Sequence, residues 1–142
     1  MTEPLADPEI LSTEECWRLL RTQSVGRFVA NRADSSPYVV PVNFVVDSNQ
    51  QLVIRTDRGL KIALVEQSLV AFEVDEIDMV HRAGWSVVVD GIARSMAPSG
   101  SDLEHEPWAP GPKELVLRIT PTKITGRRLR LNTPETDERG YR

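Results

Sequence analysis

Hydrophobic and polar residues follow a strand-like period over most of the chain from Val25 onward. The runs are rich in valine and are separated by turns of Gly, Pro, Asn, Asp and Ser, which favours short antiparallel strands. The predicted strands are Gly26–Asn31, Tyr38–Asp47, Leu52–Ile54, Leu69–Asp75, Gly84–Met96, Glu114–Thr120 and Lys123–Leu131, the last interrupted at Gly126. They predict a mainly β protein whose six or seven antiparallel strands form a small barrel.

Two stretches break the strand period and predict helices. Ser12 and Glu15 fit a capping box, and the apolar spacing that follows predicts an N-terminal helix over Thr13–Gln23. After Gly59, the run from Leu60 to Gln67 predicts a short cross-over helix between two strands. Near-continuous valines in Gly84–Met96 indicate a strand buried on both faces, as in a barrel wall that is also a subunit contact.

Size and composition fit one globular domain spanning residues 1–142, with tails at 1–10 and 132–142. A net charge of −4 and the lack of a basic face argue against a nucleic-acid partner. No apolar run is long enough to span a membrane, and no signal peptide is evident, so we expect a cytoplasmic protein. Cys16 and the two histidines, His81 and His105, are too scattered for a metal site.

The stretch after the third predicted strand carries the strongest chemical signal. Arg55, Thr56, Arg58 and Lys61 place three cations and a hydroxyl within seven positions, around a glycine turn and a helix start. Guanidinium, hydroxyl and ammonium donors at such a turn suit a phosphate group. The alternative is a solvated sheet rim, because no glycine-rich phosphate-binding motif is present.

A resemblance to a known family rests on the order of six short motifs. They read VGRFVA, PVNF, IRTDRGLK, VAFEVD, GWSVVVDGIA and LRITPTKITGRRL, over about Leu11–Leu131. The succession resembles the pyridoxamine 5'-phosphate oxidase-like family of flavin-binding split β-barrels, in its short bacterial branch. The resemblance implies a homodimer with FMN in clefts at the subunit interface.

Carried over residue by residue, the resemblance implies three groups of cofactor-binding residues. Val40, Pro41, Val42 and Asn43 would run beside the isoalloxazine ring, and Trp85 and Ser86 would lie near the partner's flavin. Arg55, Thr56 and Lys61 would hold the phosphate, with Arg58 as a further contributor.

The resemblance predicts a flavin-dependent oxidoreductase acting on a small molecule. The strand YVVPVNFVV lacks Arg and Lys, and the tail after Leu131 lacks the family's substrate signature, so we do not expect oxidation of pyridoxamine phosphate itself. A deazaflavin-dependent reductase and a non-enzymatic flavin or haem carrier or sensor are the alternatives. No catalytic acid or base can be named. His81, Trp108 and the Arg127–Arg128 pair are each compatible with a ligand contact or with an ordinary surface or packing role, and Glu73 and Asp75 are expected to face solvent.

Overall fold

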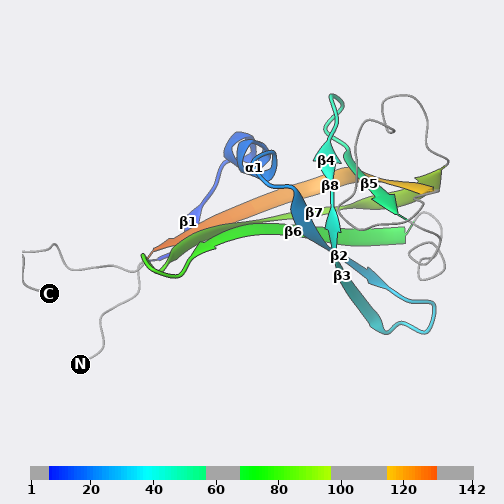
Figure 1. Ribbon diagram of the computed structural model, residues 1–142, viewed down its shortest axis with the longest axis horizontal. Helices are drawn as coiled ribbons and strands as arrows, with labels where there is room; N and C mark the ends of the chain where they lie inside the picture. Colours follow the sequence, from blue (N-terminus) through cyan, green and yellow to red (C-terminus); the bar gives the residue numbers. More distant parts are fainter. Residues whose placement is uncertain (1–6, 57–67, 97–114, 131–142) are drawn as a thin grey trace, which may run out of the picture.

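The computed structural model describes residues 7–56, 68–96 and 115–130, which form an almost all-β chain with one helix packed on a curled sheet (Figure 1). The elements are β1 (Glu9–Ile10), α1 (Thr13–Leu20), β2 (Val25–Asn31), β3 (Pro37–Asn43), β4 (Val45–Val46), β5 (Leu52–Thr56), β6 (Ser68–Asp78), β7 (Ala83–Met96) and β8 (Leu115–Arg130). The predicted mainly β class and N-terminal helix are confirmed. The predicted cross-over helix, Leu60–Gln67, lies outside the described residues.

The sheet is antiparallel throughout and runs in the order β3-β2-β6-β7-β8-β5-β4, with β1 added along β8. Its first and last strands, β3 and β4, are separated in sequence only by Phe44. The sheet therefore has to curl until its two edges approach each other at this residue. Phe44 is 2% exposed, and its backbone N–H donates to the Ser24 carbonyl at 3.1 Å. This half-barrel matches the predicted split β-barrel.

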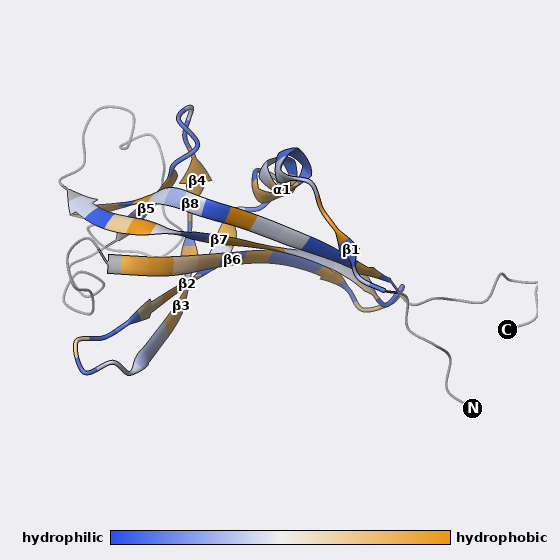
Figure 2. Ribbon diagram, turned by 180° about the vertical axis from the view of Figure 1, so that it is seen from behind, coloured by the Kyte–Doolittle hydropathy of each residue, from blue (hydrophilic) through white to orange (hydrophobic). Residues whose placement is uncertain are grey.

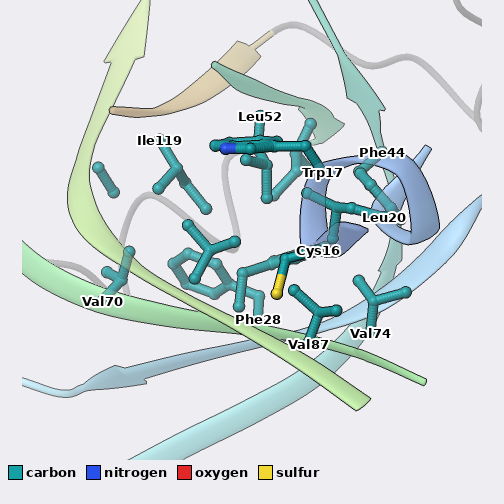
Figure 3. Packing of buried hydrophobic residues seen from close by; sticks show 14 of the residues in the cluster. Cys16, Trp17, Leu20, Phe28, Phe44, Leu52, Val70, Val74, Val87 and Ile119 are labelled. Carbon is teal, nitrogen blue, oxygen red and sulfur yellow. The ribbon is translucent and has the colours of Figure 1, made fainter. Parts of the chain in front are cut away.

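The core fills the concave side of the sheet beneath α1 (Figure 3). Cys16 and Leu20 of α1 are fully buried with Phe28 of β2 and Phe72 of β6. The Phe44 and Phe72 rings meet edge to face at 4.9 Å between centroids. Cys16 thus acts as a small apolar core residue, as expected for a free buried cysteine.

Strand β7 is buried on one face only within the described chain. Val87 and Val89 are fully buried, whereas Val88 between them is partly exposed. The expected burial of this strand on both faces is therefore not seen within the described part of one chain. Burial alternates from Ser86 to Asp90 even though Val87, Val88 and Val89 are all apolar. Figure 2 shows both hydrophobic and hydrophilic residues along the strands of the sheet.

The convex side of the sheet, called here the outer face, carries exposed apolar side chains. Directly paired residues of neighbouring strands share a face, and the register places Ile77, Gly84 and Leu129 in one row. The most exposed apolar residues of this face are Val39 at 61%, Leu69 at 73%, Ile77 at 59% and Leu129 at 47%. So much exposed apolar surface is typical of a contact surface.

The two C-terminal strands predicted from the sequence are one. Strand β8 runs unbroken for 16 residues past both Pro121 and Gly126. The proline lies where the ladder with β7 shifts register between Asp90 and Gly91, a bulge that accommodates a missing N–H donor. Gly126 lies under the helix: a Cβ there would meet the Cys16 Sγ at 2.7 Å. The glycine permits close packing and does not end the strand.

Four other boundaries differ from the prediction. The predicted strand Tyr38–Asp47 is divided at Phe44 into β3 and β4. Glu9 and Ile10, expected in a loose tail, pair with β8 as strand β1. Helix α1 ends at Leu20, three residues early, although its Ser12 cap accepts a hydrogen bond from the Glu15 N–H at 3.1 Å as predicted. The loop expected over Glu76–Ala83 is a short turn, because β6 continues to Asp78 and β7 begins at Ala83.

Among the described residues, no helix has the length and apolar composition to cross a bilayer.

Candidate functional site

The Val40–Asn43 segment lies on β3, an outermost strand of the sheet. It pairs with β2 from Phe28 back to Val25, and Pro41 stands opposite Arg27. Val40 and Val42 pack against the core, whereas Pro41 is exposed. Because a proline removes a ladder donor, an outermost strand such as β3 can hold it without losing a bond to a second neighbour.

Arg55 and Thr56 end β5, opposite Val116 and Leu115 of β8. The short strand β4 pairs with β5 just beyond Phe44, and β3 also contacts β5 directly. The structure therefore brings the Val40–Asn43 segment and the β5 end into one region, where the chain passes from β3 to β4. Arg55 is partly buried there, and Arg58 and Lys61 lie outside the described residues.

Trp85 and Ser86 lie near the start of β7 and point to opposite sides of the sheet, as consecutive strand residues must. Trp85 packs against the core and stands opposite Arg128. Ser86 stands opposite Arg127 on the outer face. Only Ser86 therefore presents its side chain to the outer face.

A pocket of about 470 Å³ opens beside these two residues, at the β6–β7 hairpin. We call it the hairpin pocket. Its volume lies in the range of small-molecule sites, and most of its lining is apolar. The lining residues are Pro8, Ile77, Asp78, Met79, Arg82, Ala83, Gly84, Trp85, Ser86, Arg127 and Leu129.

The carboxylate of Asp78 in this pocket is already bound by its own turn. Its Oδ1 accepts the backbone N–H groups of Val80 and His81, each at 3.0 Å, and its Oδ2 lies 2.6 Å from the His81 Nδ1. Hydrogen bonds from the His81 backbone and ring lower the pKa of Asp78 below its usual value. His81 forms this turn and does not line the pocket.

Arg55 and Ser86 lie toward opposite ends of the long strand β8 (Figure 1). Ser86 is opposite Arg127 and Arg55 is opposite Val116, both on β8. At about 3.3 Å per residue the path along β8 between these positions is about 36 Å. That is far longer than the ring and ribityl phosphate of one FMN. Arg55 and Ser86 are therefore well separated within one chain.

A charged cluster missed by the sequence reasoning lies on the outer face between these ends. The Arg27 Nη1 is 3.4 Å from the Asp75 Oδ1 and 3.7 Å from the Glu73 Oε1. Burial, with the hydrogen bond and charge of Asp75, raises the pKa of Glu73 to about 7, although Arg27 opposes the shift. The spacing of the two carboxylates was visible in the sequence. The cation that joins them depends on the pairing of β2 with β6.

Residues 12–128 match the family model described as pyridoxamine 5'-phosphate oxidase. The chain belongs to this family. It is 32% identical over 129 residues to the uncharacterized protein Rv0080 of Mycobacterium tuberculosis, and the match covers 84% of each chain.

Two solved structures of FAD-binding proteins share this fold. The FAD-binding protein of Mycobacterium smegmatis superposes with a TM-score of 0.66 at 35% identity, covering 87% of this chain and all of its own. The FAD-binding protein of Mesorhizobium loti has a TM-score of 0.68 at 27% identity, covering 85% of this chain and 97% of its own.

Proposed function

We propose that this family member is an FMN-binding homodimer that acts as an oxidoreductase on a small molecule. The observation that carries the proposal is the separation of about 36 Å along β8 between Arg55 and Ser86. If both groups bind one flavin, as the family resemblance implies, two copies must share each site. The two similar structures of FAD-binding proteins support a flavin as the ligand.

A two-fold dimer satisfies this requirement with one contact surface, used by both copies. In an isologous contact each copy presents the same face. If the Arg55 end of one copy meets the Ser86 end of the other, two-fold symmetry forms the same contact a second time. Two equivalent sites result. Exposed apolar residues of the outer face outside the hairpin pocket, Val39 and Leu69, would be covered by the same contact.

The residues present suit the parts of a flavin nucleotide. Arg55 and Thr56, with Arg58 and Lys61 from the sequence that follows, supply charge-assisted and hydroxyl donors for a phosphate. The Val40–Asn43 segment supplies an apolar strand edge for a flat ring, and the partner's Trp85 and Ser86 would lie near it. The bound flavin would supply hydride transfer, and the protein would bind, orient and shield it.

FMN is proposed in preference to FAD because the cationic stretch from Arg55 to Lys61 suits a terminal phosphate dianion. The two related FAD-binding proteins make FAD the second candidate. Titrating the purified chain with FMN, FAD and a deazaflavin, while following absorbance and flavin fluorescence, ranks the three. Reduction of the bound flavin by a nicotinamide donor would support an oxidoreductase. Tight binding without reduction by any donor would favour a carrier.

A complementation experiment tests whether two chains share each site. We expect Arg55→Ala to weaken FMN binding roughly 10- to 100-fold, because a hydrogen bond to a charged group contributes roughly 1.5–3 kcal/mol. Ser86→Trp places a large side chain in the other half of the proposed site, and we expect it to block FMN binding there. Arg21→Ala, which removes an exposed cation at the C-terminal end of α1, on the other side of the sheet from the proposed contact, is the control and should bind FMN normally.

Mixing the two defective variants should restore binding without either being repaired. After subunit exchange about half of the dimers are mixed, and each mixed dimer has one intact site, so about a quarter of all sites should recover tight binding. If both variants form dimers and exchange subunits but no tight sites return, the shared-site proposal is wrong.

A further inference from the structure

The hairpin pocket has apolar walls and unbalanced positive charge. Ile77, Met79 and Leu129 give it hydrophobic sides, and the Ile77 side chain lies over Gly84, where a Cβ would meet its Cδ1 at 2.8 Å. The side chains of Arg82 and Arg127 reach the same pocket. Such a site suits a ligand with a hydrophobic body and a negatively charged group.

The two arginines of the pocket differ from their sequence neighbour Arg128. Arg128 donates to the Glu9 carboxylate at 3.1 Å and to the Glu15 carboxylate at 3.2 Å. Arg82 and Arg127 have no ion pair with any carboxylate of residues 7–56, 68–96 and 115–130. Their guanidinium donors are therefore available to a ligand.

The nearest carboxylates do not neutralise this charge. Asp78 lies in the pocket, but its oxygens accept hydrogen bonds from its own turn. Asp75 is on the same face as Arg127, beyond Ser86, so two strand spacings, about 10 Å, separate their backbones. Its carboxylate pairs with Arg27 at 3.4 Å. The pocket therefore holds the two guanidinium groups of Arg82 and Arg127 and one carboxylate, Asp78, which is hydrogen-bonded within its own turn.

We propose that the hairpin pocket binds an anionic small molecule with an aromatic or aliphatic body, held by the Arg127 guanidinium and the Ser86 hydroxyl. A carboxylate matches the planar donor fork of arginine, and the apolar walls would cover the hydrophobic body. Assigning this molecule as the substrate rests on the proposed function, because that proposal brings the Ser86 end beside the flavin. The anion site itself requires only the pocket of one chain.

Calorimetric titration of the full-length, FMN-saturated protein with two matched probes tests the inference. The probes are 2-naphthoate and 2-naphthamide, which share a ring system and differ in charge. We expect naphthoate to bind at least about tenfold more tightly, and Arg127→Gln to remove most of that preference, because a hydrogen bond between charged partners contributes about this factor. Lys123→Gln is the control. It removes a cation from the same strand and face but outside the pocket, and should leave naphthoate binding unchanged.

Three results would overturn the inference. They are equal binding of the two probes, an equal loss in the Lys123→Gln protein, and, on flavin-free protein, displacement of bound naphthoate by added FMN, which would assign the pocket to the cofactor. The same titration on flavin-free protein separates this inference from the proposed function. Selective, Arg127-dependent binding of naphthoate to a chain that binds no flavin would support the anion site and refute the flavin proposal.

Discussion

The carboxyl group of Glu73 should make the stability of this protein depend on pH near neutrality. Glu73 is partly buried on the outer face, beside Asp75 and within 3.7 Å of the Arg27 guanidinium. Burial and the adjacent Asp75 carboxylate raise its pKa from 4.5 to about 7. Glu73→Gln replaces this group with a neutral amide of the same shape, which imitates the protonated acid at every pH.

The sign and size of the effect follow from proton binding. Between about pH 4.5 and pH 7 the folded protein holds a proton on Glu73 that the unfolded chain has lost, so the free energy of unfolding falls as the pH rises. A shift from 4.5 to about 7 corresponds to at most about 3 kcal/mol, at about 1.4 kcal/mol per pKa unit. The Glu73 side chain is 29% exposed, so water screens it and we expect about 1–2 kcal/mol.

Urea unfolding of the wild type and the Glu73→Gln variant, at one protein concentration and at about pH 5, 6, 7 and 8, measures this contribution. The wild type should lose about 1–2 kcal/mol relative to the variant between pH 5 and 8, with no further change above that. Glu14→Gln, which changes an exposed carboxylate in the first turn of α1, serves as the control. If the difference in unfolding free energy between wild type and Glu73→Gln stayed constant from pH 5 to 8, the explanation by proton binding at Glu73 would be refuted. A difference that moves in the opposite direction would show that Glu73 is stabilised as an anion.

Two further predictions concern the packing of the N-terminal segment on β8. Gly126→Ala should destabilise the fold by about 1–3 kcal/mol, because its Cβ would lie 2.7 Å from the Cys16 Sγ and 3.1 Å from the Leu11 Cδ1; an unchanged thermal midpoint would show that the helix can move aside. Arg128→Gln should release Glu9 from β8 and accelerate exchange of the Leu11 amide, which donates to the Gly126 carbonyl at 3.0 Å. Hydrogen exchange measured by NMR checks this, and unchanged protection of Leu11 would show that the backbone pairing suffices.

The fold was predictable from the sequence wherever local rules decide it. The Ser12 cap, the strand period and the turn residues each act over a few positions, and the N-terminal helix and a mainly β chain that they predicted are present. The boundaries that were wrong depend on distant partners. Glu9 and Ile10 become a strand because β8 offers them a free edge, and nothing within residues 1–10 signals that edge.

The sequence suggested candidate residues for the site, but it did not show which residues lie beside them in the fold. The motif order identified the Val40–Asn43 segment, Arg55 and Ser86, and the structure gives each a defined place. It did not reveal that Arg27 joins two carboxylates, because that contact needs the register of β2 on β6. The hairpin pocket was equally hidden, since its lining combines the N-terminal segment, the β6–β7 hairpin and β8.

The largest error in the sequence prediction also concealed the main argument for a shared site. Pro121 and Gly126 suggested two short C-terminal strands, and short strands would have left Arg55 and Ser86 at an unknown separation. Because a bulge absorbs the proline and the helix packs over the glycine, β8 continues for 16 residues. Its length holds the two groups about 36 Å apart along the strand. If both groups bind one flavin, as we propose, a long, continuous β8 keeps one chain from completing the site alone, and a variant that shortened β8 would lose the geometry that calls for a partner.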